Sequence, residues 1–290
     1  MDMHNVAVVM VLYLYYEYML HMTKLERLYM EIRKKGVLTS DELFELASEI
    51  LEKEELDYRY LYTEYLHKLL QRGKIIRPRR GIYVAVDPSS DPIDKDHRYI
   101  VASKIRSRYY LGFHTALELH GCAYSWFKKV TVCLPRGTLF RPFEFRDSRY
   151  VPVSTSYPDE GIESISRRDH QLIISNPSRT FLDCLDRPRL AGGWEEILKS
   201  LSSLPGVKGE ELLSMLRNFN IKVCYRKVGY VLDILKNNPY YEGILEEIQD
   251  PLLEQTRGAP VYMDRNRPGD HNEKWNIYLI PNMNRMLEGI

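Results

Sequence analysis

Between Leu56 and Ala85 the spacing of apolar positions changes from helical to β-like. Gly73 lies where a helix commonly ends, and β-branched and aromatic residues follow from Ile75. We therefore expect a helix followed by a β-hairpin. The hairpin turn is predicted at Pro78, Arg79, Arg80 and Gly81. The apolar stripe of the helix comprises Tyr58, Leu61, Tyr62, Tyr65, Leu66, Leu69 and Leu70, and its opposite face carries Arg59, Tyr60, Thr63, His67 and Gln71.

Two further helices are predicted upstream of this segment. The first begins near Thr23 and ends at Lys34-Lys35-Gly36, where cations and a glycine suit a helix C-terminus. The second is capped by Thr39 or Ser40, with Glu42 placed to reach back toward the cap. Its buried stripe comprises Leu43, Phe44, Ala47, Ile50 and Leu51. Three helices followed by a hairpin predict a winged helix-turn-helix domain over residues 23–86.

A polar stretch with two prolines, Asp87 to Pro92, follows this predicted domain. Such a segment can bury few contacts, so we expect a linker over residues 87–96 and a second domain over residues 97–290. The length of 290 residues and the apolar content of 44% allow two domains, each with its own core.

The second half alternates between helical and strand patterns, which predicts a mixed α/β (α+β) domain. Asn176 followed by Pro177 is a typical helix start, and Arg187-Pro188 a typical end. Helices are expected at 99–105, 113–120, 177–187, 194–201, 209–219 and 225–236. Strands are expected at 129–134, 143–145, 150–152, 170–175, 261–263 and 275–280.

The cysteines and histidines give no pattern of a metal or cofactor site. Four cysteines lie far apart without a C-x-x-C pair, so we expect buried thiols in a reducing cytoplasm. His114 and His120 are six residues apart, which places them on different faces of a helix. We expect no metal, no cofactor and no catalytic residue.

The first 22 residues form an apolar extension. Its uninterrupted stretch from Val6 to Tyr16 is too short to span a bilayer comfortably, Glu17 interrupts it, and no cation precedes it as in a signal peptide. We interpret it as an appended helix or strand. Translation that starts at Met22 and a membrane anchor are the alternatives.

Charge is concentrated around the predicted wing. Residues 57–86 carry seven cations and two carboxylates, a net charge of +5, whereas residues 41–57 carry one cation and eight carboxylates, a net charge of −7. The whole chain is at +1. A basic edge beside an acidic helix would attract and orient a phosphate backbone. A solvated basic turn and a protein-binding winged helix are the alternatives.

Four stretches, in this order, carry a resemblance to a known family. They are the wing RGKIIRPRRGIYVAV, the helix LGFHTALELHG, the block SNPSRTFLDCLDRPRLAGGWEEIL and the late segment PVYMDRNRPGDHNEKWNIYLI. Over residues 23–285 the chain resembles AbiEi-type antitoxins, the transcriptional regulators of type IV toxin–antitoxin systems.

The resemblance implies a winged helix that represses the promoter of its own operon. It also implies a C-terminal α/β domain that counters a toxin similar to a nucleotidyltransferase, without requiring a stable complex between the two. The expected partners are therefore double-stranded operator DNA, bound by a monomer or a dimer, and the toxin, with no membrane partner.

Two groups of DNA-binding residues are predicted. Arg59, Tyr60, Thr63 and His67 on the solvent face of the third helix would meet base edges, with Arg59 as the preferred reader of guanine. Lys68, Lys74, Arg77, Arg79 and Arg80 would contact phosphates or a minor groove beside the wing. Tyr83 is expected in the core. Exposed polar residues need no function, which is the alternative for each position.

The start of the second domain is also basic, with a net charge of +7 over residues 97–150. This predicts either an extended DNA footprint or a surface for RNA or an acidic protein. Farther on, Arg179 and Asp183 are expected to pair within one helix as a structural contact, and Trp194 and Trp275 to anchor the core.

The alternative to a repressor is a DNA-guided nuclease or nucleotidyl transferase with its active site in the second domain. Asp94 and Asp96 have a two-carboxylate spacing but lack the upstream glycine-serine turn, and Asp159 is not followed by an acidic-x-lysine strand. No phosphate-binding glycine loop or Cys/His dyad is present in the sequence. The sequence therefore favours a non-enzymatic regulator.

Overall fold

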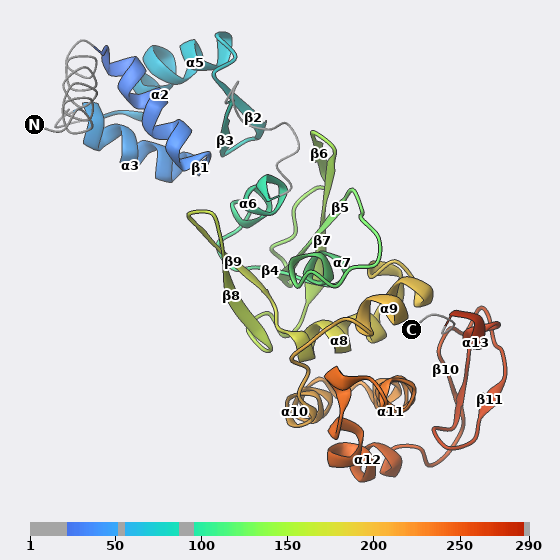
Figure 1. Ribbon diagram of the computed structural model, residues 1–290. Helices are drawn as coiled ribbons and strands as arrows, with labels where there is room; N and C mark the ends of the chain where they lie inside the picture. The colour runs from blue at the N-terminus through green and yellow to red at the C-terminus, as the bar shows by residue number, and fades with distance from the viewer. Residues whose placement is uncertain (1–21, 52–55, 87–95, 287–290) are drawn as a thin grey trace, which may run out of the picture. The chain divides into compact units, whose positions relative to one another are not determined.

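The computed structural model describes residues 22–51, 56–86 and 96–286, and the chain divides into two units, Met1–Ile105 and Arg106–Ile290 (Figure 1). Except for Met22, the apolar extension expected at residues 1–22 lies outside the described residues, as does all but Asp96 of the linker expected at residues 87–96.

The first unit begins with two capped helices. In α2 (Lys24–Lys35), Thr23 and Glu26 form a capping box, and Gly36 ends the helix at a φ of 71°. Before α3 (Ser40–Leu51), the Thr39 amide donates to Glu42 at 2.8 Å and the Glu42 amide donates to Thr39 at 3.2 Å. Thr39 is thus the cap of the second predicted helix, and Glu42 reaches back as expected.

The third predicted helix is continuous but not uniform. It consists of α4 (Tyr58–Leu61), a π-helical segment η1 (Tyr62–Leu66) and α5 (His67–Gln71). Leu61 and Leu66 are five residues apart and both are 0% exposed. In an α-helix of about 3.6 residues per turn, such positions point roughly 140° apart, so the wider π turn brings both leucines to the same buried face.

The wing belongs to a three-stranded antiparallel sheet of order β1-β3-β2, formed by β1 (Val37–Thr39), β2 (Ile75–Arg79) and β3 (Ile82–Ala85). The predicted turn is shorter than expected: Arg79 pairs with Ile82, so only Arg80 and Gly81 turn the chain. Pro78 lies in edge strand β2, where the register shifts and its missing N–H breaks no pairing. Strand β1 was not predicted, because three residues carry too little periodicity.

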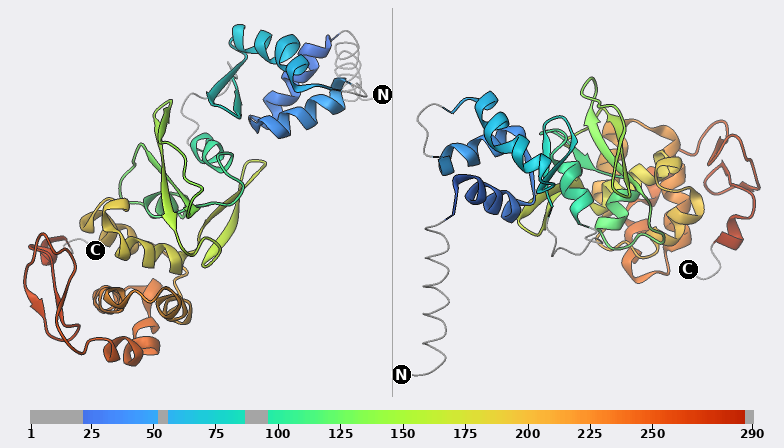
Figure 2. Two further views of the ribbon diagram at one scale, coloured as in Figure 1. Left: turned by 180° about the vertical axis from the view of Figure 1, so that it is seen from behind. Right: turned by 90° about the horizontal axis from the view of Figure 1, so that it is seen from above.

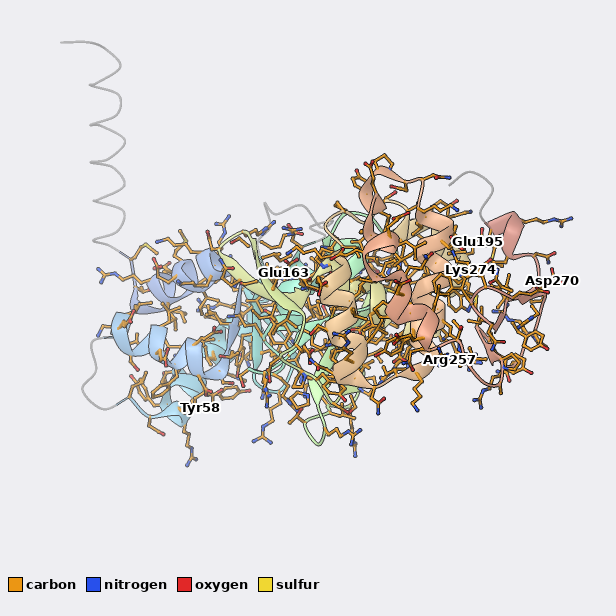
Figure 3. All side chains as sticks on the ribbon, turned by 90° about the horizontal axis from the view of Figure 1, so that it is seen from below. Tyr58, Glu163, Glu195, Arg257, Asp270 and Lys274 are labelled. Atoms are coloured by element: carbon orange, nitrogen blue, oxygen red, sulfur yellow. The ribbon has the colours of Figure 1, made fainter. Side chains whose placement is uncertain are left out.

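The core of this unit joins all three helices to the sheet. Fully buried side chains include Leu28, Leu43, Leu61 and Ile75, and Tyr83 is 1% exposed, as predicted. The prediction for Tyr58 was wrong: its side chain is 38% exposed, at the start of the third helix (Figure 3). Helix α6 (His97–Ser103), predicted at 99–105, belongs to the same unit.

The second unit contains a mixed six-stranded sheet of order β6-β7-β5-β4-β9-β8. Its strands are β4 (Tyr110–Leu111), β5 (Lys129–Pro135), β6 (Phe143–Phe145), β7 (Ser148–Thr155), β8 (Ile162–Arg167) and β9 (His170–Ser175). Strands β5 and β7 are parallel, as are β4 and β9, and the other neighbours are antiparallel. The mixed α/β class predicted for the C-terminal domain is confirmed.

Helices cover this sheet in layers, as Figures 1 and 2 show. Helix α8 contacts the sheet at β9, and α10 and α11 pack on α8. The helices of the unit are α7 (His114–Leu119), α8 (Pro177–Asp186), α9 (Trp194–Leu201), α10 (Gly209–Phe219), α11 (Lys222–Leu235), α12 (Ile244–Glu254) and the short α13 (Met283–Met286). Three 2-residue strands, β10 (Val261–Tyr262), β11 (His271–Asn272) and β12 (Ile277–Tyr278), form a separate sheet.

Helix α8 is fixed by an ion pair that the sequence predicts. Arg179 Nε donates to Asp183 Oδ1 at 2.7 Å, and Arg179 Nη2 donates to the Tyr110 hydroxyl, also at 2.7 Å. Arg179 is 2% exposed and also donates to the carbonyl oxygens of Tyr157 and Glu160. Such full satisfaction of a buried guanidinium supports a structural role.

The large core of this unit contains both predicted anchors, Trp194 and Trp275. Trp275 is 0% exposed, and a Cβ on Gly229 would lie only 2.1 Å from its ring. Glycine is therefore required at that helix position for close packing. All four cysteines are buried, as expected, and burial raises the pKa of the Cys122 thiol to about 12.

Candidate DNA-binding surface

The predicted base-reading residues lie together on the exposed side of the third helix. Arg59, Tyr60, Thr63 and His67 are all exposed. Three of them follow one another at four-residue intervals through the π segment, and the Thr63 hydroxyl donates to the Arg59 carbonyl oxygen at 2.8 Å. We name these four residues the helix face. Because the π-helical turns are wide, the buried leucines stay off this face, and its side chains are exposed over about two turns of the helix.

Aromatic contacts hold the two ends of the helix face. The Tyr60 ring meets the Tyr65 ring edge-on at a centroid distance of 6.1 Å, and the His67 ring lies 6.2 Å from that of Tyr62. Burial, with Tyr60 beside it, raises the pKa of the half-buried Tyr65. The rings limit the rotamers that Tyr60 and His67 can adopt, which reduces the entropy lost when they contact a ligand.

The predicted phosphate-contacting residues differ in their surroundings. Lys68 is ion-paired with Glu64 at 2.9 Å, an exposed pair that costs little to break. Lys74 Nζ lies 5.2 Å from the Tyr29 ring centroid and Arg77 Cζ lies 5.6 Å from that of Tyr83. Arg80 is exposed in the turn, whereas Arg79 is half-buried. We name Lys74, Arg77, Arg79 and Arg80 the wing cations.

A tyrosine pair connects the third helix to the wing. The hydroxyl oxygens of Tyr58 and Tyr83 are 3.1 Å apart, and the Tyr58 hydroxyl also lies 3.4 Å from Ser40 Oγ. Burial of Tyr83 and its hydrogen bond with Tyr58 raise the pKa of the Tyr83 hydroxyl. The sequence placed Tyr58 in the apolar stripe and missed this contact, since helical spacing cannot distinguish a core tyrosine from one that bridges two elements.

The acidic stretch predicted upstream forms the outer side of α3. Asp41, Glu45 and Glu49 are exposed there, and the first turn contains no cation to offset them. The carboxylates of Glu52, Glu54 and Glu55 lie outside the described residues. The charge contrast between this helix and the wing would disfavour phosphates at α3.

The basic stretch predicted over residues 97–150 crosses the boundary between the units and does not form a single cluster of available charges. Arg98 is 6% exposed, Lys104 is bound to Glu42, and Arg108 forms an ion pair with Asp159. Lys128, Arg136, Arg141, Arg146 and Arg149 are exposed. The prediction of an extended surface is thus reduced to these five residues and remains a prediction.

The described carboxylates considered for catalysis, Asp96 and Asp159, belong to no group that could hold a metal ion. Asp94 lies outside the described residues, and Asp159 is exposed in its ion pair with Arg108. Over residues 22–51, 56–86 and 96–286, no three His, Cys, Asp or Glu side chains are grouped so that they could hold a metal ion. His120 instead hydrogen-bonds the Ser175 carbonyl oxygen at 2.9 Å.

None of the helices within the described ranges combines the length and apolar character needed to cross a bilayer. Chemically, the helix face offers a guanidinium, a hydroxyl, an imidazole and a phenol, which suit hydrogen bonding to base edges. The wing offers cations that suit phosphate oxygens. This combination of groups matches a duplex with a readable groove.

Comparison with known proteins supports this assignment for the first unit. Residues 26–86 match the family described as "Transcriptional regulator, AbiEi antitoxin". The resemblance predicted from the sequence is therefore confirmed over those residues, which include most of α2, the second and third predicted helices and the wing. No curated protein matches the chain.

The fold also resembles a solved structure. The RV2827C protein from Mycobacterium tuberculosis matches with a TM-score of 0.59 and 14% identity, over 90% of this chain and 92% of that one. At this identity the match shows a shared fold alone. It extends the similarity beyond the winged helix into the second unit.

Proposed function

We propose that this protein is a sequence-specific DNA-binding repressor that acts as the antitoxin of a type IV toxin–antitoxin operon. It would act in the cytoplasm as a binding protein rather than an enzyme. The observation that carries the proposal is the exposed helix face beside the wing cations, within the segment that matches AbiEi antitoxin transcriptional regulators.

In the proposed complex the third helix enters a major groove. Arg59 reaches a guanine edge, because its guanidinium can donate two parallel hydrogen bonds to O6 and N7. Thr63, His67 and Tyr60 contact neighbouring bases, and the wing cations bind phosphates on one side of the groove. Phosphate contacts set the position of the domain, and base contacts select the sequence.

Operator binding is tested with the full chain and a fluorescent duplex taken from the region upstream of its own gene. We expect saturable binding at least about a thousandfold tighter than to a duplex of shuffled sequence at 0.15 M salt. Equal affinity for the two duplexes would exclude sequence-specific repression. A double variant of exposed cations in the second unit, Arg217→Ala with Lys222→Ala, serves as the control and should bind like the wild type.

Antitoxin activity is tested separately by co-expression with the product of the adjacent reading frame. We expect that product to arrest growth and this chain to restore it. A second arm uses the Arg59→Ala variant expressed from a foreign promoter. Because neutralisation is assigned to the second unit, this variant should still restore growth. If neither the wild-type chain nor the Arg59→Ala variant restores growth, the antitoxin role is refuted. The proposal of operator binding is not affected by that result.

A further inference from the structure

The second unit contains a cavity of about 810 Å³ that no part of the proposed repressor function uses. It is lined by the C-terminal end of α8, the following 3-10 turn η2 (Pro188–Leu190), the start of α9, one side of α11 and residues 260–267. Its volume lies in the upper part of the range of roughly 300–1,000 Å³ that small-molecule sites occupy.

The lining of this cavity has an excess of positive charge. Five cations and two carboxylates face it, namely Arg187, Arg189, Lys227, Arg265 and Arg267 against Asp186 and Asp264. Both carboxylates are already engaged: Asp186 with Arg187 at 3.3 Å, and Asp264 with Arg267 at 3.3 Å. Within the described part of the chain, Arg189 and Arg265 form no ion pair, and the lining as a whole carries three more cations than carboxylates.

Lys227 is the most unusual of these groups. Its side chain is 5% exposed, and Nζ donates to the Leu185 carbonyl oxygen at 2.9 Å. An ammonium has three N–H donors, and no carboxylate of the described residues lies within ion-pair distance of this one. Burial lowers the pKa of Lys227, while the more distant Asp186 and Asp264 act in the opposite direction. Buried charges in proteins are normally paired, so the position calls for an anion.

The start of α9 adds further donors to the same cavity. Gly193, the N-cap, has a φ of 93° and offers no side chain to the first-turn amides. The carboxylates of that turn are engaged by other partners: Glu195 (Figure 3) pairs with Lys199 at 2.8 Å, and Glu196 accepts from His114 and Ser125. The positive end of the helix dipole therefore adds to the cationic lining.

The cavity also has apolar and aromatic walls. The Trp194 ring centroid lies 5.5 Å from Lys227 Nζ, and Tyr262 is 37% exposed and stacked on Tyr278 at 4.9 Å. Val223, Val261 and Met263 complete this side. A single phosphate would leave most of the volume unfilled, whereas a polyphosphate attached to a flat, partly apolar group would use both kinds of wall.

We propose that this cavity binds a small molecule carrying a polyphosphate group, of which a nucleoside triphosphate is the best fit. Lys227 and the start of α9 hold one phosphate inside the cavity, and Arg189 and Arg265 hold the others nearer its mouth. Guanidinium groups suit this role because their paired N–H donors match two phosphate oxygens. The base lies against the exposed ring of Tyr262, while Trp194, 3% exposed, supports the wall from behind.

Isothermal titration calorimetry of the full chain at 0.15 M salt tests this proposal, with ATP, GTP and tripolyphosphate as separate probes and no DNA present. We expect at least one probe to bind with a dissociation constant in the micromolar range. Tighter binding of a nucleotide than of tripolyphosphate would show a base contact. Equal binding would assign the affinity to the phosphates, and both results support the site. Absence of heat with all three probes at 1 mM would overturn it.

Variants separate this cavity from other basic surfaces. Lys227→Met keeps the length of the buried stem and should weaken binding by about tenfold or more. Lys222→Met, on the exposed side of the same helix, is the matched control and should leave it unchanged. If Lys227→Met does not fold, the double variant of the exposed residues Arg189→Ala with Arg265→Ala is compared with the Lys222→Met control instead. Unchanged affinity in both lining variants would refute the proposal.

Discussion

At the residue scale, the candidate surface contains two kinds of group with different expected effects on binding. Arg59 is exposed on the helix face, where a guanidinium can address a base edge. Lys74 lies beside the wing and above the Tyr29 ring, where an ammonium is placed to meet phosphates. Substitution of Arg59 should change which DNA sequence is bound. Substitution of Lys74 should change the affinity for all DNA sequences.

The first prediction compares these two residues. Arg59→Ala should weaken operator binding by about 1–3 kcal/mol with little effect on shuffled DNA, because only a base contact is lost. Lys74→Ala should weaken binding to the operator duplex and to the shuffled duplex by the same factor. Fluorescence anisotropy with each duplex measures the ratio of the affinities for operator and shuffled DNA. A uniform loss in Arg59→Ala would remove this residue from base reading.

The second prediction concerns the buried pair in the second unit. Arg179→Met leaves the Asp183 carboxylate buried without its partner, so unfolding free energy should fall by about 3–5 kcal/mol. The exposed Arg217→Met is the matched control and should change stability by less than about 0.5 kcal/mol. Urea denaturation followed by tryptophan fluorescence reports this unit, which holds all three tryptophans. A loss below about 1 kcal/mol would show that the pair contributes little.

Some residue roles follow directly from the sequence and others do not. Asn176 caps α8 by accepting from the Arg179 amide at 2.8 Å, as its position before Pro177 predicts. Local chemistry of this kind involves neighbours in the chain. The Tyr58–Tyr83 contact and the hydrogen bond from Lys227 to the Leu185 carbonyl oxygen join residues 25 or more positions apart, which no spacing rule can specify.

At the scale of elements, the π segment decides which residues the third helix presents. It lets Leu61 and Leu66 share the buried face while Arg59, Thr63 and His67 stay exposed in line. A regular α-helix could satisfy one of these requirements over this stretch but not both. We infer that the five-residue spacing of the leucines selects the π turn.

The third prediction tests the π turn by deleting one residue from it. Deletion of Thr63 places the flanking leucines four apart, so the helix can become regular and the unit should still fold. Arg59 and His67, then seven residues apart, would stay within about 20° of each other, but Glu64 would take the place of Thr63 between them. Because a carboxylate would then face the DNA, operator affinity should fall by more than about tenfold. Circular dichroism shows whether the variant folds, and fluorescence anisotropy measures its affinity for the operator. Thr63→Ala is the control for the lost hydroxyl, and an equal loss there would contradict a role for the π turn.

The fourth prediction uses the cap of α3. Burial opposes ionisation of Glu42, but hydrogen bonds from Lys104 and Thr39 outweigh it and lower the pKa of this carboxyl below 4.5. Its stabilisation should be complete above the unfolded-state pKa and disappear as pH falls through the lower folded-state value. Hydrogen exchange of α3 amides should be faster in Glu42→Gln at pH 7 and converge with wild type in acid. A difference that persists in acid, where this carboxyl is protonated in both the folded and the unfolded state, would contradict this coupling.

Elements with a clear apolar pattern were predicted more reliably than polar ones or those of only two residues. The ranges of β9, α9 and α10 agree with the sequence patterns, because their apolar periodicity is strong. Strand β8 was missed since its side chains are mostly half-exposed and polar, and β4 since it has only two residues. Helix α12 was missed because its Pro251 reads as an interruption.

At the scale of the whole molecule, a net charge of +1 conceals strong local separation. The wing cations and the lining of the second-unit cavity are both basic, while α3 is acidic. Electrostatic attraction to DNA should therefore arise from a few named residues rather than from the total charge. This distinguishes a specific regulator from a protein that binds nucleic acid through general basicity.

The most direct measurement of the central claim is the salt dependence of operator binding by wild type and by the double variant Arg77→Gln with Arg80→Gln. Both side chains are exposed on the wing. If each neutralises one phosphate, the slope of log affinity against log salt should become shallower by about 2 in the variant. The control Arg217→Gln with Lys222→Gln should keep the wild-type slope. An unchanged slope in the wing variant would contradict the assignment of this surface to DNA.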